Sequence, residues 1–185
     1  MNTSERIVAA RGHVYLAAPN TEPFDIKGFV FSRTSAPGTG WSWLGDHSAE
    51  NLPAVDSEGG DATVLRTWDE EATDVTRAAM THTITINVAN VSPTTLLAVF
   101  PGSVENTAGG YVTLPASGGS RKQAVLIVIE NGTRVAALYF PNVDLAGSFP
   151  SLSLDQYTEI PVNGSVLAGS GAVLQRIYKP VTRTV

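Results

Sequence analysis

Residues 124–140 read AVLIVIENGTRVAALYF. An Asn-Gly pair between two apolar runs predicts a β-hairpin with a two-residue type I′ turn, because few other residue pairs tolerate its positive φ angles. In the expected register, Glu130 faces Thr133 and Val128 faces Val135. Strand side chains alternate between faces, so both faces of this hairpin would be apolar. One face can pack within the domain, and the other needs the helix or another subunit.

Other strands surround this hairpin in the sequence. Residues 80–88 alternate between apolar and polar side chains, which is typical of a strand with one buried and one wet face. One face would hold His82, Ile84, Ile86 and Val88, and the other Thr81, Thr83, Thr85 and Asn87. Further strands are expected at residues 12–18, 41–45, 62–67 and 172–179, with a second hairpin at Asn163-Gly164.

Residues 92–100, SPTTLLAVF, are the best candidate for a helix. The serine suits the N-cap, and the proline suits the first helical position. Leu96, Leu97 and Phe100 fall on one stripe at spacings of three and four residues, so we expect them to face the sheet. The Pro-Gly pair that follows ends the helix.

Frequent glycines and prolines between short β-branched runs favour a mainly β protein. We predict an antiparallel β-sandwich or flattened barrel with one short flanking α-helix. The length fits a single domain over residues 1–185. Within it we expect an N-terminal arm at 1–10, long loops at 19–40 and 46–75, and a C-terminal arm at 179–185.

The composition excludes several classes of protein. The chain has no cysteine, which excludes a disulfide scaffold, a thiolate metal site and a cysteine nucleophile. We find no signal peptide and no apolar run of the roughly 18 residues that a membrane span needs, so we expect synthesis in the cytoplasm and no membrane partner. Arg121-Lys122 is the one adjacent pair among scattered bases. A sequence-reading DNA-binding domain usually presents a basic stripe instead.

The negative charge is concentrated in one segment. Residues 46–74 contain nine carboxylates and one base, Arg66, whereas the whole chain has a net charge of −5. Such a segment binds a cation, repels an anion or forms a solvated loop. Asp56, Glu58 and Asp61 could ligate Ca²⁺, but their spacing does not match an EF-hand loop. A solvated turn or an interface loop is therefore the preferred interpretation.

Few residues point to catalysis. The histidines are His13, His47 and His82. No Gly-x-Ser-x-Gly elbow accompanies them, which favours packed or surface histidines over a Ser-His-Asp site. Asp69, Glu70 and Glu71 are consecutive and point in different directions, which disfavours a glycosidase pair. We expect no catalytic residue, no metal and no cofactor.

Three tryptophans, Trp41, Trp43 and Trp68, lie around the acidic segment. The strand expected at 41–45 would place the first two on one face. Large aromatic residues pack in a core or anchor an interface, and core packing is the default. An exposed set would instead form a platform for carbohydrate.

The run Asp-Ser-Glu-Gly-Gly-Asp-x-Thr-x-x-x-Thr-Trp at 56–68 resembles the major tail proteins, or tail tube proteins, of long-tailed (siphovirus-type) bacteriophages, particularly those of actinobacterial hosts. In that family a Trp-x-x-Leu/Ile-Gly strand is common just upstream, and residues 41–45 fit it loosely. The threonine-rich strand followed by the helix at 92–100 also matches the family's order. The resemblance covers roughly residues 10–140.

The resemblance implies a structural virion protein without catalytic residues. Copies of such a protein form rings, six to a ring in the family, whose inner strands join into a continuous barrel. Stacked rings then make a tube that conducts genomic DNA without sequence-specific binding. The implied partners are further copies of the protein, the tape-measure protein, and the tail terminator and distal tail proteins. A negative wall would repel DNA phosphates.

This resemblance suggests two sets of contact residues. Contacts between rings or subunits are expected from acidic residues and their basic partners: Asp56, Glu58, Asp61, Asp69, Glu70, Glu71, Arg121 and Lys122, with Arg6 and Arg183 as further bases. The lumen wall is expected along Thr81, Thr83, Thr85 and Asn87, and the hairpin offers an alternative face. Two other assignments stay open: another β-rich virion protein (tail terminator, connector or decoration protein) and a carbohydrate-binding sandwich module.

Overall fold

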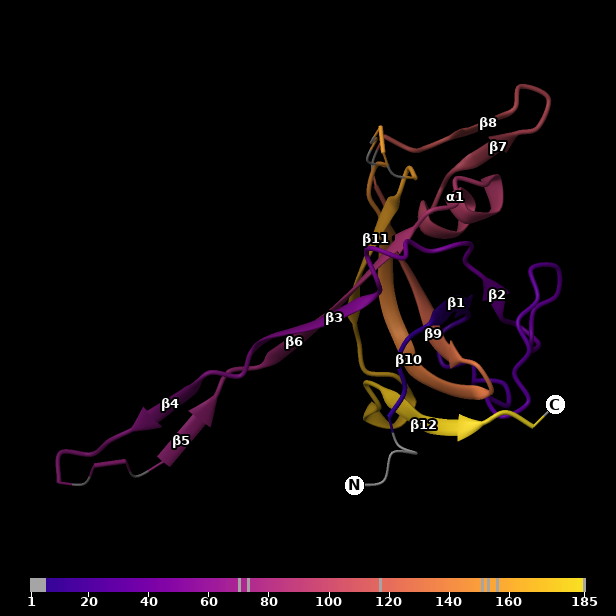
Figure 1. Ribbon diagram of the computed structural model, residues 1–185. Helices are drawn as coiled ribbons and strands as arrows, with labels where there is room; N and C mark the ends of the chain where they lie inside the picture. Colours follow the sequence, from indigo (N-terminus) through magenta and orange to yellow (C-terminus); the bar gives the residue numbers. More distant parts are fainter. Residues whose placement is uncertain are drawn as a thin grey trace.

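The computed structural model describes residues 6–69, 71–72, 74–116, 118–150, 152, 154–155 and 157–184. Over these residues the main sheet has eight antiparallel strands in the order β2-β1-β9-β10-β11-β6-β3, with β12 paired to β10 beside this path (Figure 1). The β4–β5 and β7–β8 pairs form two small separate sheets. The mainly β, antiparallel fold with a short helix is confirmed.

The elements have the following bounds. The strands are β1 Arg11–Ala17, β2 Ser42–Trp43, β3 Ala54–Gly59, β4 Ala62–Leu65, β5 Asp74–Arg77, β6 Met80–Val88, β7 Val104–Asn106, β8 Tyr111–Thr113, β9 Arg121–Asn131, β10 Arg134–Gly147, β11 Ile160–Val166 and β12 Arg176–Thr182. The α-helix α1 spans Pro93–Val99, and the 3₁₀ turn η2 spans Ser170–Ala172.

The β9–β10 hairpin lies at the centre of the sheet, but its turn differs from the predicted one. Asn131 pairs with Arg134, so the turn residues are Gly132 and Thr133. Gly132 has a φ of 60° and Thr133 has no positive φ, which is the type II′ pattern. The predicted type I′ turn is therefore wrong, and the register is displaced by two residues. Because side chains alternate with a period of two, each one still lies on its predicted face.

Both faces of the hairpin are apolar, as predicted, and each belongs to a separate core. The first core is enclosed by β1, β6, β9, β10 and β11. The second lies on the outer side of β1, β9 and β10. Residues of the irregular 19–40 segment cover it, with Phe24, Ile26 and Phe29 among them, together with Trp41 and β12. The expectation that this face needs the helix or another subunit is wrong.

A short segment, residues 42–48, closes the sheet into a flattened barrel. On one side, the backbone N–H of Leu44 donates to the carbonyl of Val14 in β1 at 2.9 Å. On the other side, the carbonyl of Asp46 accepts from Ala89, just beyond β6, at 2.8 Å. Since β1 and β6 lie near opposite ends of the strand order, these bonds join its two sides.

Helix α1 packs on the barrel's core. The Ser92 side chain accepts from the backbone N–H of Thr95 at 3.2 Å, which confirms the predicted N-cap. Thr95 and Val99 are its buried residues, and Leu96 and Phe100 pack partly against the core. The predicted stripe is therefore rotated: Leu97 is not among the residues that pack against the core, and it lines a surface pocket.

The predicted second hairpin at Asn163-Gly164 is wrong, because both residues lie inside β11. Gly164 is there for a packing reason. A Cβ on it would lie 2.6 Å from the side chains of Leu145 and Val143, so only glycine fits between them without a shift. Similarly, the strand predicted at 172–179 begins later, at Arg176.

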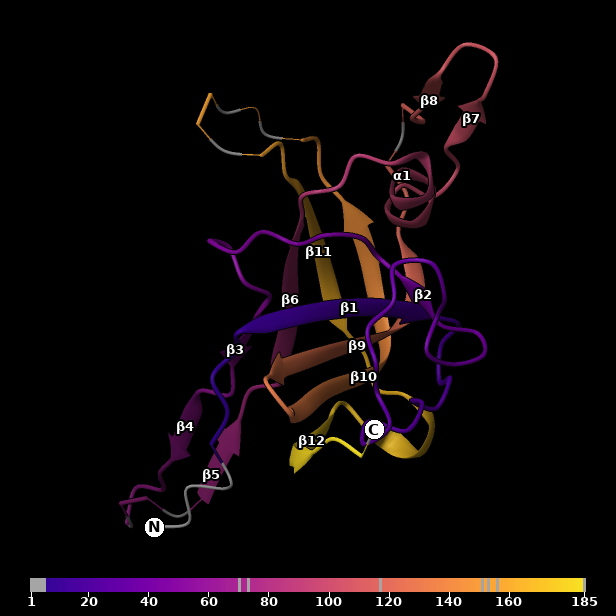
Figure 2. The ribbon, with the colours of Figure 1, turned by 45° about the vertical axis from the view of Figure 1, so that its right-hand side comes forward.

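The expected loop at 46–75 contains β3, β4 and the start of β5. β3 pairs with β6, and the β4–β5 hairpin continues the same ribbon away from the barrel (Figures 1 and 2). We call residues 54–80 the arm. Its acidic and glycine-rich sequence is unusual for strands. These strands could not be predicted from an alternating pattern, because a ribbon exposed on both faces needs none. The expected C-terminal arm at 179–185 is also paired as far as Thr182 in β12.

Candidate assembly surfaces

One outer face of the sheet is polar across five strands. In successive pairs, Asp56 lies opposite Thr83, Thr83 opposite Ser165, Ser165 opposite Asp144, and Asp144 opposite Lys122. Directly opposed residues project from the same face of a sheet. We call this surface the polar face. It also holds Glu58, Thr81, Thr85, Asn87, Asn163 and Ala146, by the same registers.

The polar face unites two sets of residues that the sequence analysis kept apart. The predicted lumen residues Thr81, Thr83, Thr85 and Asn87 all lie on it, opposite the buried Ile84 and Ile86 side of β6. Asp56 and Glu58, predicted as contact residues, lie on the same face at its β3 edge. The threonines of β6 and the carboxylates of β3 therefore belong to one surface.

The polar face ends in two edges of unlike charge. Within the described residues, β3 pairs with β6 alone and presents Asp56 and Glu58. At the other end, β1 stops pairing with β9 at Ala124, so residues 121–123 pair only with β10 among the described segments. That edge presents Lys122 on the polar face. Unpaired strand edges are ready templates for another chain.

Arg121 and Lys122 point to opposite faces of β9, because neighbours in a strand alternate. Lys122 lies opposite Asp144 on the polar face, whereas Arg121 lines a pocket on the other side. Both are exposed, and neither has an ion pair among the described residues. These two bases, which were predicted together as contact residues, therefore lie on separate surfaces.

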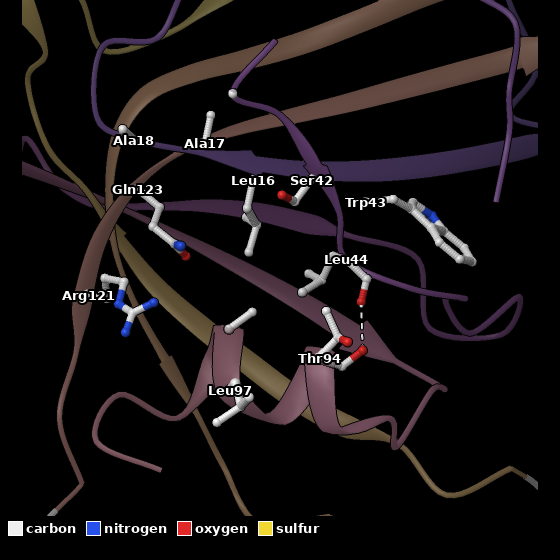
Figure 3. Close-up of a pocket in the computed structure, with 13 residues that line it drawn as sticks. Leu16, Ala17, Ala18, Ser42, Trp43, Leu44, Thr94, Leu97, Arg121 and Gln123 are labelled. Carbon is white, nitrogen blue, oxygen red and sulfur yellow. Dashed lines mark hydrogen bonds between the residues drawn. The ribbon is translucent and has the colours of Figure 1, made fainter. Parts of the chain in front are cut away.

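The pocket lies between α1 and the β1–β2 side of the barrel, and its volume is about 360 Å³ (Figure 3). Its walls are mainly apolar, with Leu16, Leu44 and Leu97 among them, and Arg121 lies at one side. A hydrogen bond of 3.1 Å from the Thr95 hydroxyl to the Leu44 carbonyl fixes the helix to the closing segment. We call this hollow the helix pocket.

Asp56 and Glu58 lie at the base of the arm, and the remaining acidic candidates lie farther out along it. Asp61 lies between β3 and β4, and Asp69 and Glu71 lie beyond β4 near the arm's tip. All three are exposed, and no carboxylate of this set has an ion pair within the described residues. Glu70 lies outside the described residues. The structure brings none of these carboxylates near Arg121 or Lys122 within one chain, since Figure 1 shows the arm and α1 on opposite sides of the barrel.

Residues 1–179 match the family described as phage tail tube protein. The chain belongs to this family. It is also 28% identical over 137 residues to the major tail protein Gp23 of Mycobacterium phage D29, a match that covers 71% of this chain and 68% of that protein. A tail tube protein is a structural component of the virion tail, where its copies build the tube.

The histidines of this tail tube protein are packed residues. His13 is buried, and its Nε2 lies 2.8 Å from an Oε1 of Glu130 while its ring stacks on Phe31. Burial lowers the pKa of His13, and the Glu130 carboxylate opposes that shift. Arg183 pairs with the other oxygen of Glu130, so this base is engaged inside its own chain and is a poor candidate for an inter-subunit partner.

His47, in the closing segment, has both ring nitrogens shielded from solvent, although the residue as a whole is half-buried. Burial lowers its pKa to about 4. His82 differs, because its Nδ1 contacts the Ser57 hydroxyl at 2.7 Å in the exposed base of the arm. No described carboxylate contacts this pair, so a Ser-His-Asp arrangement is absent from the described residues.

The tryptophans of the tail tube protein are divided between core and surface. Trp41 is buried, and Trp43 packs at the edge of the same core beside Phe31. Trp68 is fully exposed on the arm, at 102% of its reference area. The three therefore do not form a common platform for carbohydrate.

No group of three metal-ligating side chains occurs in the described part of the chain. Asp56 and Glu58 share a face, but they lie along an open strand edge rather than around a hollow. Among the described residues, no helix is both long and apolar enough to cross a membrane.

Proposed function

We propose that this protein is the subunit of a tail tube in which copies join side by side into closed rings through the two edges of the polar face. The observation that carries this proposal is the opposite charge of those edges. β3 presents Asp56 and Glu58, and the start of β9 presents Lys122. An edge that fits a different edge gives a head-to-tail contact, which closes into a ring when the rotation allows it.

In such a ring the polar face lines the lumen. The apolar side chains of these strands point to the other side of the sheet, into the barrel core, so the polar face has no apolar patch to bury. Its threonines, serine and asparagine are neutral, and its charges are Asp56, Glu58 and Asp144 against Lys122. A wall with excess negative charge repels DNA phosphates and forms no lasting contacts with them. Genomic DNA would therefore pass without sequence-specific binding.

The arm supplies the contact between rings in this proposal. It extends well beyond the barrel (Figures 1 and 2), and its acidic residues have no ion pair within the described residues. Charge reversal at Asp69, Glu70 and Glu71 is expected to impair stacking more than folding. The tape-measure protein, the tail terminator and the distal tail proteins are the expected partners of the finished tube in the virion, and the subunit is made in the host cytoplasm. Neither catalysis nor a cofactor has a part in this function.

Electron microscopy of the concentrated protein tests the ring contact. The variant Lys122→Glu and the double variant Asp56→Lys/Glu58→Lys should each lose rings, because like charges then meet at the contact. Combining all three substitutions restores unlike edges and should restore rings. Glu105→Lys, an exposed site on β7, controls for the change in net charge.

Two results would contradict the proposal. The first is a wild-type protein that stays monomeric at high concentration even with tail initiator and tape-measure proteins present. The second is normal ring formation by both edge variants. Closed rings that never stack would instead support a connector or tail terminator.

A further inference from the structure

The arm ends in a residue that is costly to leave in water. Trp68 is fully exposed, and two apolar residues of the arm, Val64 and Val75, form a directly opposed pair that is about half-exposed. A large aromatic side chain is the most common kind of anchor in protein interfaces. Within the described residues nothing packs on Trp68, so any partner for it must come from outside this chain.

The same molecule carries an apolar hollow that can receive such an anchor. The helix pocket holds about 360 Å³ between α1 and the closing segment, and Leu16, Leu44 and Leu97 are among its walls. Figure 3 shows Arg121 and Gln123 on one side of this hollow and Trp43 on the other. A hollow of this size accommodates an indole ring, and its apolar lining favours one.

The charges around the two partners are complementary. Asp69 and Glu71 follow Trp68 on the arm and outnumber Arg66, which precedes it, and Arg121 lies at the side of the helix pocket. Neither these carboxylates nor Arg121 has an ion pair within the described part of its own chain. Opposite charges around a buried anchor mainly set orientation and the rate of association.

The placement of the two surfaces excludes a contact within one chain and fits a contact between chains. Figures 1 and 2 show the arm leaving one end of the barrel while α1 lies at the opposite end. Trp68 lies ten positions beyond Glu58, and an extended strand of that length spans roughly 30 Å. A copy displaced along the arm's direction therefore presents its helix pocket to the arm's tip. Repetition of this head-to-tail contact generates an open stack rather than a closed pair.

From these observations we infer that Trp68 of one copy inserts into the helix pocket of a copy in the next ring, with Asp69 and Glu71 placed against Arg121. This inference rests on the proposed stacking of rings and names the residues that perform it. It also separates the two adjacent bases: Lys122 serves the contact within a ring, and Arg121 serves the contact between rings.

Variants of the anchor and of the pocket test this inference. Trp68→Ala should leave rings intact and raise the protein concentration needed for tubes roughly 30-fold, the factor expected for an interface hot spot. Thr94→Trp introduces an indole at an exposed position of the pocket and should block stacking in the same way. Phe149→Ala removes another exposed aromatic ring, which belongs neither to the arm nor to the lining of the helix pocket, and should have no effect. Normal tubes from both Trp68→Ala and Thr94→Trp would overturn the inference and leave the proposed function standing.

Cross-linking locates the contact directly, because the chain has no cysteine of its own. Asp69→Cys protein is mixed with Thr94→Cys protein, assembled, and treated with a short bismaleimide. A mixed dimer that is absent from either variant alone supports the inference. Tubes that give no mixed dimer contradict it, whereas a wild-type protein that forms neither rings nor tubes contradicts the proposed function itself.

Discussion

Gly164 is a tightly packed position of the barrel, and alanine there should destabilise the subunit. An added Cβ would lie 2.6 Å from the Leu145 and Val143 side chains and 3.0 Å from Ile84. All three neighbours are fully buried, so none can move into solvent. Overpacking of this kind costs about 1–3 kcal/mol, and the lower backbone entropy of unfolded alanine offsets about 0.4–1 kcal/mol.

We therefore expect Gly164→Ala to lower the free energy of unfolding by about 1–2 kcal/mol. In a chain of this size each kcal/mol lowers Tm by about 2–4 °C. The assay is thermal or urea unfolding, followed by circular dichroism at concentrations below assembly. Gly118→Ala is the matched control, because open space surrounds that position, and its Tm should stay the same or rise slightly.

A double variant tests the cause. Val143→Ala removes a methyl group that Gly164→Ala would meet, so the two changes together should cost about 1 kcal/mol less than the sum of their separate effects. Strictly additive effects, or a Gly164→Ala protein as stable as the wild type, would refute the packing argument.

Three other changes probe the rest of the fold. The pKa of His47 falls from 6.5 to about 4 on folding, so the folded state binds fewer protons than the unfolded state between these pH values. The free energy of unfolding should therefore decrease by about 3 kcal/mol as the pH falls through that window. A His47→Gln variant whose stability keeps the wild-type dependence on pH would contradict this. Glu130→Ala leaves Arg183 and His13 without their shared carboxylate and should cost about 3 kcal/mol in urea unfolding, whereas the exposed Glu105→Ala should cost under about 0.5 kcal/mol. Ser92→Ala removes the cap on α1 and should cost about 1 kcal/mol, with an unchanged Tm as the opposing result.

The central hairpin could be predicted from the sequence because its signals agree. Two long apolar runs around an Asn-Gly pair strongly favour a β-hairpin. Because side chains alternate with a period of two, a register shift of two residues keeps each side chain on its predicted face even when the turn type is wrong. β6 was equally clear, since its alternating threonines and isoleucines match the observed burial. Local capping residues likewise placed α1 within one residue at each end.

The prediction of a second hairpin was wrong because a dipeptide that is typical of turns lies inside a strand. Asn163-Gly164 has the composition of a turn, yet Gly164 is required by side chains from two neighbouring strands. The alternation of Ile160, Val162 and Val166 with Pro161, Asn163 and Ser165 was the signal that could have identified β11 and its place on the polar face.

The assembly surfaces depend on pairings that a single sequence does not state. That Asp56, Thr83 and Lys122 lie in one row follows only from the registers of four neighbouring strand pairs. The cover of the second core was missed for a similar reason, since the segment containing Phe24 and Phe29 has glycine and proline spacing typical of a solvated loop.

The seating of β12 on β10 governs when a newly made subunit is complete. Arg134 pairs with Thr182, and Arg11 pairs with Glu130. The central hairpin therefore pairs with one strand that precedes it in the sequence, β1, and with one that follows it, β12. Such long-range pairing is slow, and a chain leaving the ribosome exposes its N-terminal part first. The hairpin's outer face, which Phe24, Phe29 and Trp41 cover in part, therefore receives the rest of its cover only when residues 176–182 emerge.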